Sequence, residues 1–122
     1  MSFEVKGLST AAYTVPDLDA GKEWYSRAFG IEPYFDEPFY VGFNINGFEL
    51  GLMPQEGERT VGNSTISYWA VDDVQAAFDH FKASGAAEVE APSDVGGGVI
   101  VATVADPWGN SIGIIFNPAF DK

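Results

Sequence analysis

The chain has 122 residues, of which 46% are hydrophobic and 15% aromatic, and it contains no cysteine. This composition is typical of a folded domain with a buried core, and it excludes disulfides, thiolate metal sites and cysteine nucleophiles. Eighteen acidic residues against six basic ones give a formal net charge of −12, so nucleic acid and anionic membranes are poor partners.

The acidity has two interpretations, which are solubility and the attraction of a cationic small molecule. The first ten residues do not form a signal peptide, and no apolar run approaches the roughly 18 residues of a membrane span. The sequence therefore predicts a soluble cytoplasmic protein.

The first half predicts a strand, a helix and three further strands. Asp17 is a suitable N-cap for the helix and Gly30 a suitable stop, while Asn46-Gly47 favours a tight hairpin turn. The expected ranges are residues 8–15 for the first strand, 18–29 for the helix, two short strands around Asp36-Glu37-Pro38, and 48–54 for the fourth strand.

The second half repeats this plan. Residues 10–30, TAAYTVPDLDAGKEWYSRAFG, align with residues 66–85, ISYWAVDDVQAAFDHFKASG, at an offset of about 56 residues. The expected ranges are a connection over residues 55–63, strands over 66–71, 86–91, 98–106 and 111–117, a helix ending near Ser84, and a loop over 92–98.

Two βαβββ units in one chain predict an α+β fold in which each helix covers one face of a curled four-stranded sheet. Alternation along the first strand turns Ala11, Tyr13 and Val15 toward the helix and Thr10, Ala12 and Thr14 toward the concave face. The same rule places Ile66, Tyr68 and Ala70 on the concave face of the second sheet. Most aromatic residues are expected in the core, namely Trp24, Tyr25, Phe29, Trp69, Phe78 and Phe81.

Three stretches resemble a known family. TVPDLDAGKEWYSRAFGIEP in the first half, with VDDVQAAFDHFKASGA and ADPWGNSIGIIFNP in the second, resemble the vicinal oxygen chelate superfamily, also called the glyoxalase, bleomycin-resistance and dioxygenase group. The resemblance covers residues 8–118, and it implies one domain over residues 1–122 whose modules, about 8–54 and 64–118, form an open cup. It also implies a homodimer.

The resemblance implies four metal-ligand positions, which fall on Thr10, Glu49, Ile66 and Gly113. Only Glu49 can ligate a metal ion, and the single histidine, His80, lies within the second helix. Three or four donors are needed to hold such an ion. We therefore expect neither metal nor other cofactor, which argues against the metal-dependent lyase, dioxygenase, transferase and epimerase reactions of the family.

Glu49 is the main candidate site residue. Its carboxylate is expected to accept a hydrogen bond from a ligand, to pair with a ligand cation, or to act as a base whose pKa is raised by desolvation; the alternative is a solvated acid or a cap on a buried donor. Tyr68 can stack on a ligand or simply pack, and Trp108 can line the cup mouth, a subunit contact or plain surface. The remaining expected lining residues are Thr10, Thr14, Met53, Ile66 and Gly113.

The leading hypothesis is a metal-independent protein that binds a small organic molecule in the cup, similar to bleomycin-resistance proteins and with a cationic aromatic ligand. A second hypothesis is a metal-free lyase or isomerase that uses Glu49 as general base on a small carbonyl compound. A third is a noncatalytic structural or regulatory module whose cup is filled by its own side chains.

Overall fold

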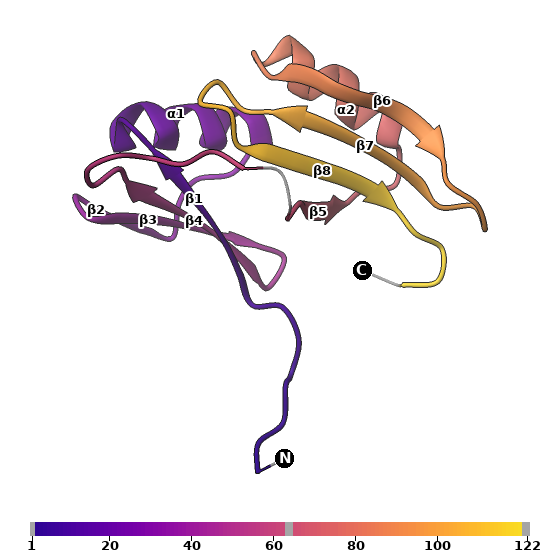
Figure 1. Cartoon of the computed structure of the whole chain (residues 1–122), viewed down its shortest axis with the longest axis horizontal. Helices are drawn as coiled ribbons and strands as arrows, with labels where there is room; N and C mark the ends of the chain where they lie inside the picture. Colours follow the sequence, from indigo (N-terminus) through magenta and orange to yellow (C-terminus); the bar gives the residue numbers. More distant parts are fainter. Residues whose placement is uncertain (1, 63–64, 121–122) are drawn as a thin grey trace. The chain divides into compact units, whose positions relative to one another are not determined.

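The computed structural model describes residues 2–62 and 65–120. Residue 63, the expected end of the connection, and residue 64, the expected start of the second module, lie outside the described residues. The chain divides into two compact units, Met1–Gly57 and Glu58–Lys122 (Figure 1). Each unit has the predicted order of one strand, one helix and three strands, which confirms the α+β fold of two βαβββ modules.

The first unit contains one four-stranded sheet and one helix. Its elements are β1 (Thr10–Val15), α1 (Leu18–Phe29), β2 (Phe35–Glu37), β3 (Tyr40–Ile45) and β4 (Phe48–Pro54). The strand order is β1-β4-β3-β2, with β1 parallel to β4 and the other neighbours antiparallel (Figure 1). The parallel pair is possible because α1 and the hairpin strands separate β1 from β4 in sequence.

The predicted bounds of α1 are confirmed by its caps. The Asp17 carboxylate accepts a hydrogen bond from the Ala20 amide at 3.2 Å, and Gly30 ends the helix with a φ of 67°. Strand β1 begins at Thr10 rather than at residue 8, and Leu8 is 72% exposed. Without a neighbouring strand, residues 2–8 gain no ladder hydrogen bonds.

The second unit repeats the arrangement. Its elements are β5 (Ser67–Ala70), α2 (Val74–Ala83), β6 (Ala87–Asp94), β7 (Ile100–Ala105) and β8 (Ser111–Phe116), in the strand order β5-β8-β7-β6. Neither helix is long and apolar enough to cross a membrane, as judged on the described residues.

Strand β6 is longer than predicted. A loop was expected from Pro92 onward, but the strand continues to Asp94 with register shifts after Glu88 and after Glu90. Because β6 is the edge of its sheet, Pro92 need not donate a ladder hydrogen bond on the open side, and an edge strand tolerates it.

Burial confirms the predicted faces of β1. Ala11, Tyr13 and Val15 are buried, whereas Thr10 and Ala12 are exposed and Thr14 is half-buried. Of the aromatic residues expected in the core, four are buried, namely Trp24, Tyr25, Phe78 and Phe81. The other two, Phe29 and Trp69, are half-buried. In the first unit, the sheet face opposite α1 is therefore the one available to ligands. It is here called the helix-free face.

The turn between β7 and β8 is held by a buried carboxylate. Asp106 is 3% exposed, and its Oδ1 accepts from the amides of Trp108 at 2.9 Å and Asn110 at 2.8 Å. Its Oδ2 accepts from the Asn110 side-chain amide at 2.8 Å. Arg59 donates to the Trp108 carbonyl at 2.8 Å and to Asn110 Oδ1 at 3.0 Å. Asp106, Trp108 and Asn110 belong to the DPWGN motif, and these hydrogen bonds hold the motif in its turn.

Candidate functional site

The helix-free face of the first sheet carries several polar and aromatic side chains. Strand alternation and register give its members, which are Thr10, Ala12 and Thr14 of β1, Glu49, Gly51 and Met53 of β4, Tyr40, Gly42 and Asn44 of β3, and Phe35 and Glu37 of β2. Four of the residues expected from the sequence, Thr10, Thr14, Glu49 and Met53, thus share one face.

The Glu49 carboxylate lies at the centre of a group of hydroxyls. Thr10 is directly opposite Glu49 in the β1–β4 register, and its Oγ1 donates to Glu49 Oε1 at 2.9 Å. The Tyr34 hydroxyl donates to Oε2 at 2.5 Å, and the Tyr40 hydroxyl also hydrogen-bonds the carboxylate. Glu49 is half-buried, and three side-chain donors compensate its charge.

These hydrogen bonds decide the protonation of Glu49. The Tyr34 hydroxyl, followed by those of Thr10 and Tyr40, lowers the pKa of Glu49 against the opposing effect of desolvation. The alternative of a Glu49 pKa raised by desolvation is therefore wrong. The sequence did not reveal that Tyr34 and Tyr40 lie beside Glu49. Glu49 in turn raises the pKa of Tyr34, while burial followed by Glu49 raises the pKa of Tyr40 to about 12.

Two glycines make room for the two tyrosines. A methyl group on Gly51 would lie 1.9 Å from the Tyr40 hydroxyl oxygen, and one on Gly42 would lie 2.9 Å from the Tyr34 ring and 2.8 Å from Glu49 Oε2. Gly42 and Gly51 are opposite each other across β3 and β4. The phenol groups therefore lie directly on the backbone of the sheet, which no other residue type would permit.

An exposed group of aromatic rings continues from Tyr34 to the edge of this sheet. Tyr34 is 63% exposed, Phe35 37% and Phe39 65%. The ring centroids of Tyr34 and Phe35 are 6.4 Å apart, and those of Phe35 and Phe39 are 5.9 Å apart. Exposed rings of this kind can stack on a flat ligand and make cation–π contacts.

The second sheet carries the remaining expected residues in an apolar arrangement. A methyl group on Gly113 would lie 2.6 Å from Tyr68 Cδ1 and 2.9 Å from Ile66 Cγ2. Tyr68 is 43% exposed and opposite Gly113 in the β5–β8 register. Trp108 lies in the β7–β8 turn, half-buried, so it does not share this strand face.

The four positions that the family resemblance assigns to metal ligands do not fit a divalent ion. Thr10 donates its hydroxyl proton to Glu49, and at Gly113 the Tyr68 ring and the Ile66 side chain take the space of a ligand side chain. Across residues 2–62 and 65–120 no group of three or more His, Cys, Asp or Glu side chains is placed to hold a metal. His80 is exposed on α2.

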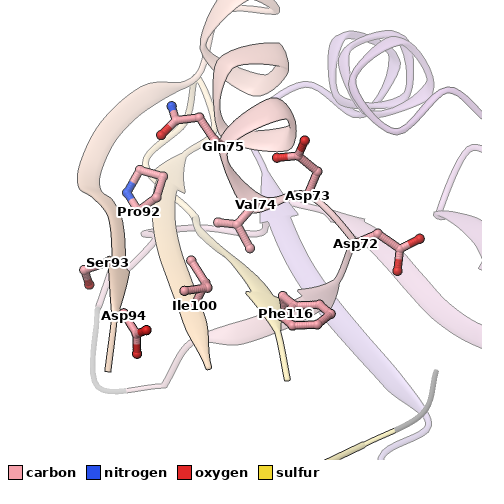
Figure 2. A pocket seen from close by; sticks show the side chains of 9 residues that line it. All are labelled: Asp72, Asp73, Val74, Gln75, Pro92, Ser93, Asp94, Ile100 and Phe116. Carbon is pink, nitrogen blue, oxygen red and sulfur yellow. The ribbon is translucent and has the colours of Figure 1, made fainter. Parts of the chain in front are cut away.

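The second unit also has an open hollow of about 470 Å³ on the helix side of its sheet (Figure 2). Val74, Ile100 and Phe116 lie between Asp72 and Asp73 on one side and Asp94 on the other (Figure 2). The lining is completed by Gln75, Pro92 and Ser93. Two of the carboxylates serve the backbone, since Asp73 caps α2 through the Ala76 amide and Asp94 accepts from the Gly96 amide. None of the candidate site residues from the sequence analysis lines this hollow.

Tyr34 and Tyr40 were missed in the sequence analysis. Tyr40 could have been found from the sequence, because the Asn46-Gly47 hairpin fixes the β3–β4 register. That register places Tyr40, Gly42 and Asn44 on the face of Glu49. Tyr34 had no such signal, since it precedes β2 in irregular structure.

Comparison with known proteins gives a consistent result at the level of fold. The profile of the Glyoxalase/Bleomycin resistance protein/Dioxygenase superfamily matches residues 7–114. Among curated proteins, no sequence matches the chain significantly. A crystal structure of a glyoxalase-related enzyme from Fulvimarina pelagi is similar, with a TM-score of 0.80, 22% identity, and coverage of 96% of this chain and 92% of the other.

Two further structures show the same fold. Lactoylglutathione lyase from Agrobacterium tumefaciens has a TM-score of 0.75 and 22% identity, with 96% of this chain and 98% of the other covered. A glyoxalase/bleomycin resistance protein from Albidiferax ferrireducens T118 has a TM-score of 0.74 and 21% identity, with 90% and 98% covered. At these identities the likeness concerns the fold.

Proposed function

The chain belongs to the Glyoxalase/Bleomycin resistance protein/Dioxygenase superfamily, and on this premise we propose that it binds a small, flat, cationic organic molecule without the help of a metal ion. The binding site is the helix-free face of the first sheet around Glu49. The observation that carries the proposal is the Glu49 carboxylate, which three hydroxyls keep ionised beside exposed aromatic rings.

The hydrogen-bond pattern around Glu49 favours a ligand that donates. An ionised carboxylate has no proton, so Thr10, Tyr34 and Tyr40 must each supply the proton of their hydrogen bond to it. Their hydroxyl protons are then committed, and the group presents only acceptor lone pairs and a negative charge to a ligand. An anion or a pure acceptor gains nothing there, whereas a cation with N–H groups gains charge-assisted hydrogen bonds.

The neighbouring rings favour a flat ligand. Tyr34, Phe35 and Phe39 are exposed side by side at the sheet edge and provide stacking area next to the carboxylate. A cation over such a ring gains about 0.5–2 kcal/mol. The net charge of −12 adds a long-range attraction that speeds the arrival of cations.

The protonation of Glu49 supports binding over catalysis. A general base works best when its pKa is close to the operating pH, and the hydroxyls move the pKa of Glu49 in the opposite direction. Sequestration of an intact ligand, as the resemblance to bleomycin-resistance proteins implies, needs no such base.

Calorimetric titration tests the proposal with 2-naphthylmethylammonium as the cationic probe and 2-naphthylmethanol as its neutral counterpart. We expect saturable binding of the cation, weaker binding of the alcohol, and a loss of about 10- to 100-fold in affinity for the cation in Glu49→Gln. Glu23→Gln, which removes an exposed carboxylate from α1, is the matched control and should stay within about twofold of wild type. Equal affinity of wild type and Glu49→Gln for the cation would contradict the proposal.

We include a homodimer in the proposal. Strands β1 and β2 are the edges of the first sheet, and the preceding arm exposes Phe3, Val5 and Leu8. Sheet edges and apolar arms of this kind are commonly covered by a second copy. Light scattering coupled to size-exclusion chromatography should give twice the 13.1 kDa chain mass, and a mass of one chain at micromolar concentration would contradict this part.

A further inference from the structure

The three hydroxyls around Glu49 are not held equally. Thr10 lies on β1 and Tyr40 on β3, and the Tyr40 hydroxyl is seated against Gly51, where a methyl group would lie 1.9 Å away. Tyr34 belongs to neither a strand nor a helix, and it is 63% exposed. The Tyr34 backbone amide donates to the Gly42 carbonyl at 2.9 Å, but its side chain is exposed, so its hydroxyl can leave the carboxylate without disturbing the sheet.

Tyr34 also covers one oxygen of the carboxylate, Oε2. Glu49 Oε2 lies against the sheet backbone, because a methyl group on Gly42 would be 2.8 Å from it. The Tyr34 hydroxyl bonds the same oxygen, and its ring lies over Gly42 as well. A ligand that approaches Oε2 from solvent therefore meets the Tyr34 hydroxyl first.

A ligand can replace the Tyr34 hydroxyl favourably only if it brings a hydrogen-bond donor of its own. Breaking a hydrogen bond to a half-buried carboxylate leaves an unsatisfied acceptor, which is unfavourable unless another donor takes its place. A primary or secondary ammonium, an amidinium or a guanidinium supplies an N–H donor together with its charge. A quaternary ammonium supplies charge alone, so it cannot restore the lost hydrogen bond.

We propose that Tyr34 is an exchangeable cap on Glu49, and that ligands reach the carboxylate by donating an N–H in place of the Tyr34 hydroxyl. The site thereby selects N–H-bearing aromatic cations over quaternary ammonium ions that carry the same aromatic group. This inference rests on the proposed function, since it names the class of cation that the same site accepts and gives Tyr34 the role of a cap that the ligand displaces.

The test crosses two ligands with two variants in the full chain. The ligands are 2-naphthylmethylammonium and its N,N,N-trimethyl derivative, and the variants are Tyr34→Phe and Tyr40→Phe. Wild type should bind the N–H cation at least about 10-fold more tightly than the trimethyl cation, as one charge-assisted hydrogen bond predicts. Tyr34→Phe keeps the ring but has no hydroxyl to displace. Both cations should therefore bind more tightly than in wild type, by about 10-fold for the N–H cation, while the preference between the two cations persists.

Tyr40→Phe is the control for the loss of any one donor. It also removes a hydroxyl from Glu49, but one that is seated in the sheet and is not displaced by the ligand, so the affinity for the N–H cation should stay within about threefold of wild type. If Tyr34→Phe binds the N–H cation no more tightly than wild type does, or if wild type binds both cations equally, the exchange is overturned while the proposed function stands. If wild type binds neither cation, the proposed function fails and the exchange fails with it.

Discussion

The ring of Tyr68 lies on Gly113, so closely that a methyl group on this glycine would be 2.6 Å from Tyr68 Cδ1 and 2.8 Å from its Cγ. The two residues are opposite each other across the parallel strands β5 and β8. The family resemblance assigned a metal-ligand position to Gly113. In this chain the position instead supports an aromatic ring, and in the first sheet the Glu49 carboxylate accepts hydrogen bonds from hydroxyls.

The contact between Tyr68 and Gly113 makes the glycine sensitive to any side chain. Gly113→Ala should lower the free energy of unfolding by about 1–3 kcal/mol, because Tyr68 and Ile66 must move to admit the methyl group. Gly62→Ala is the control, since nothing lies within 4 Å of a methyl group there, and it should change stability by less than about 1 kcal/mol. Urea denaturation measures both. Equal effects would show that the Tyr68 contact is not tight.

The carboxylate of Asp106 should be the most important one for stability in the second unit. Asp106→Ala removes three hydrogen bonds at a buried position and should lower the free energy of unfolding by about 2–4 kcal/mol. Asp94→Ala removes one exposed contact, with the Gly96 amide, and should lower it by less than about 1 kcal/mol. Thermal or urea denaturation of the two variants gives the comparison, and a smaller loss in Asp106→Ala than in Asp94→Ala would contradict the role assigned to this turn.

The lowered pKa of Glu49 predicts that the stability difference between wild type and Glu49→Gln depends on pH. Because the pKa of folded Glu49 lies below its ordinary value of 4.5, the ionised group stabilises the fold fully above that pH, and this stabilisation is lost as the pH falls through the lower folded value. Wild type should therefore exceed Glu49→Gln in stability by a constant amount near neutral pH, and the two should converge in acid. Urea denaturation across the acid range checks this, and a difference that grows on acidification would refute the direction of the pKa shift.

Tyr40 should lose its proton only in strong base, because burial and Glu49 raise its pKa to about 12. Phenolate absorbance after a rapid pH jump should show a step near this value that Tyr40→Phe removes. In Glu49→Gln the step should move to lower pH but stay above 10.0, because burial is the larger cause of the shift. A step unchanged in Tyr40→Phe would assign it to another tyrosine.

The sequence was sufficient for the elements whose limits are set by local chemistry. Asp17 and Gly30 fix the ends of α1, and the Asn46-Gly47 hairpin fixes the start of β4 at Phe48. The end of β6 was not predictable in the same way. Pro92 reads as the start of a loop unless the strand is known to be a sheet edge, and the strand order is a property of the tertiary structure.

The candidate site was predictable only in part, for the same reason. The family resemblance and strand alternation brought Thr10 and Glu49 to one face, and the structure joins them by a hydrogen bond of 2.9 Å. The protonation of Glu49 depends most on Tyr34, which lies 15 positions away in the sequence and outside any strand. Since desolvation and hydrogen bonding act in opposite directions, the sign of the pKa shift required the positions of both tyrosines.

The central claim, that a flat cation binds at Glu49 on the first sheet, is tested most directly by mapping amide chemical shifts in a ¹⁵N spectrum during titration with 2-naphthylmethylammonium. We predict that the largest changes fall on Tyr34, Tyr40, Gly42, Glu49 and Gly51, and that Glu49→Gln greatly reduces them. Changes confined to the residues of the hollow in the second unit, around Val74 and Phe116, or the absence of changes at saturating ligand, would contradict the account.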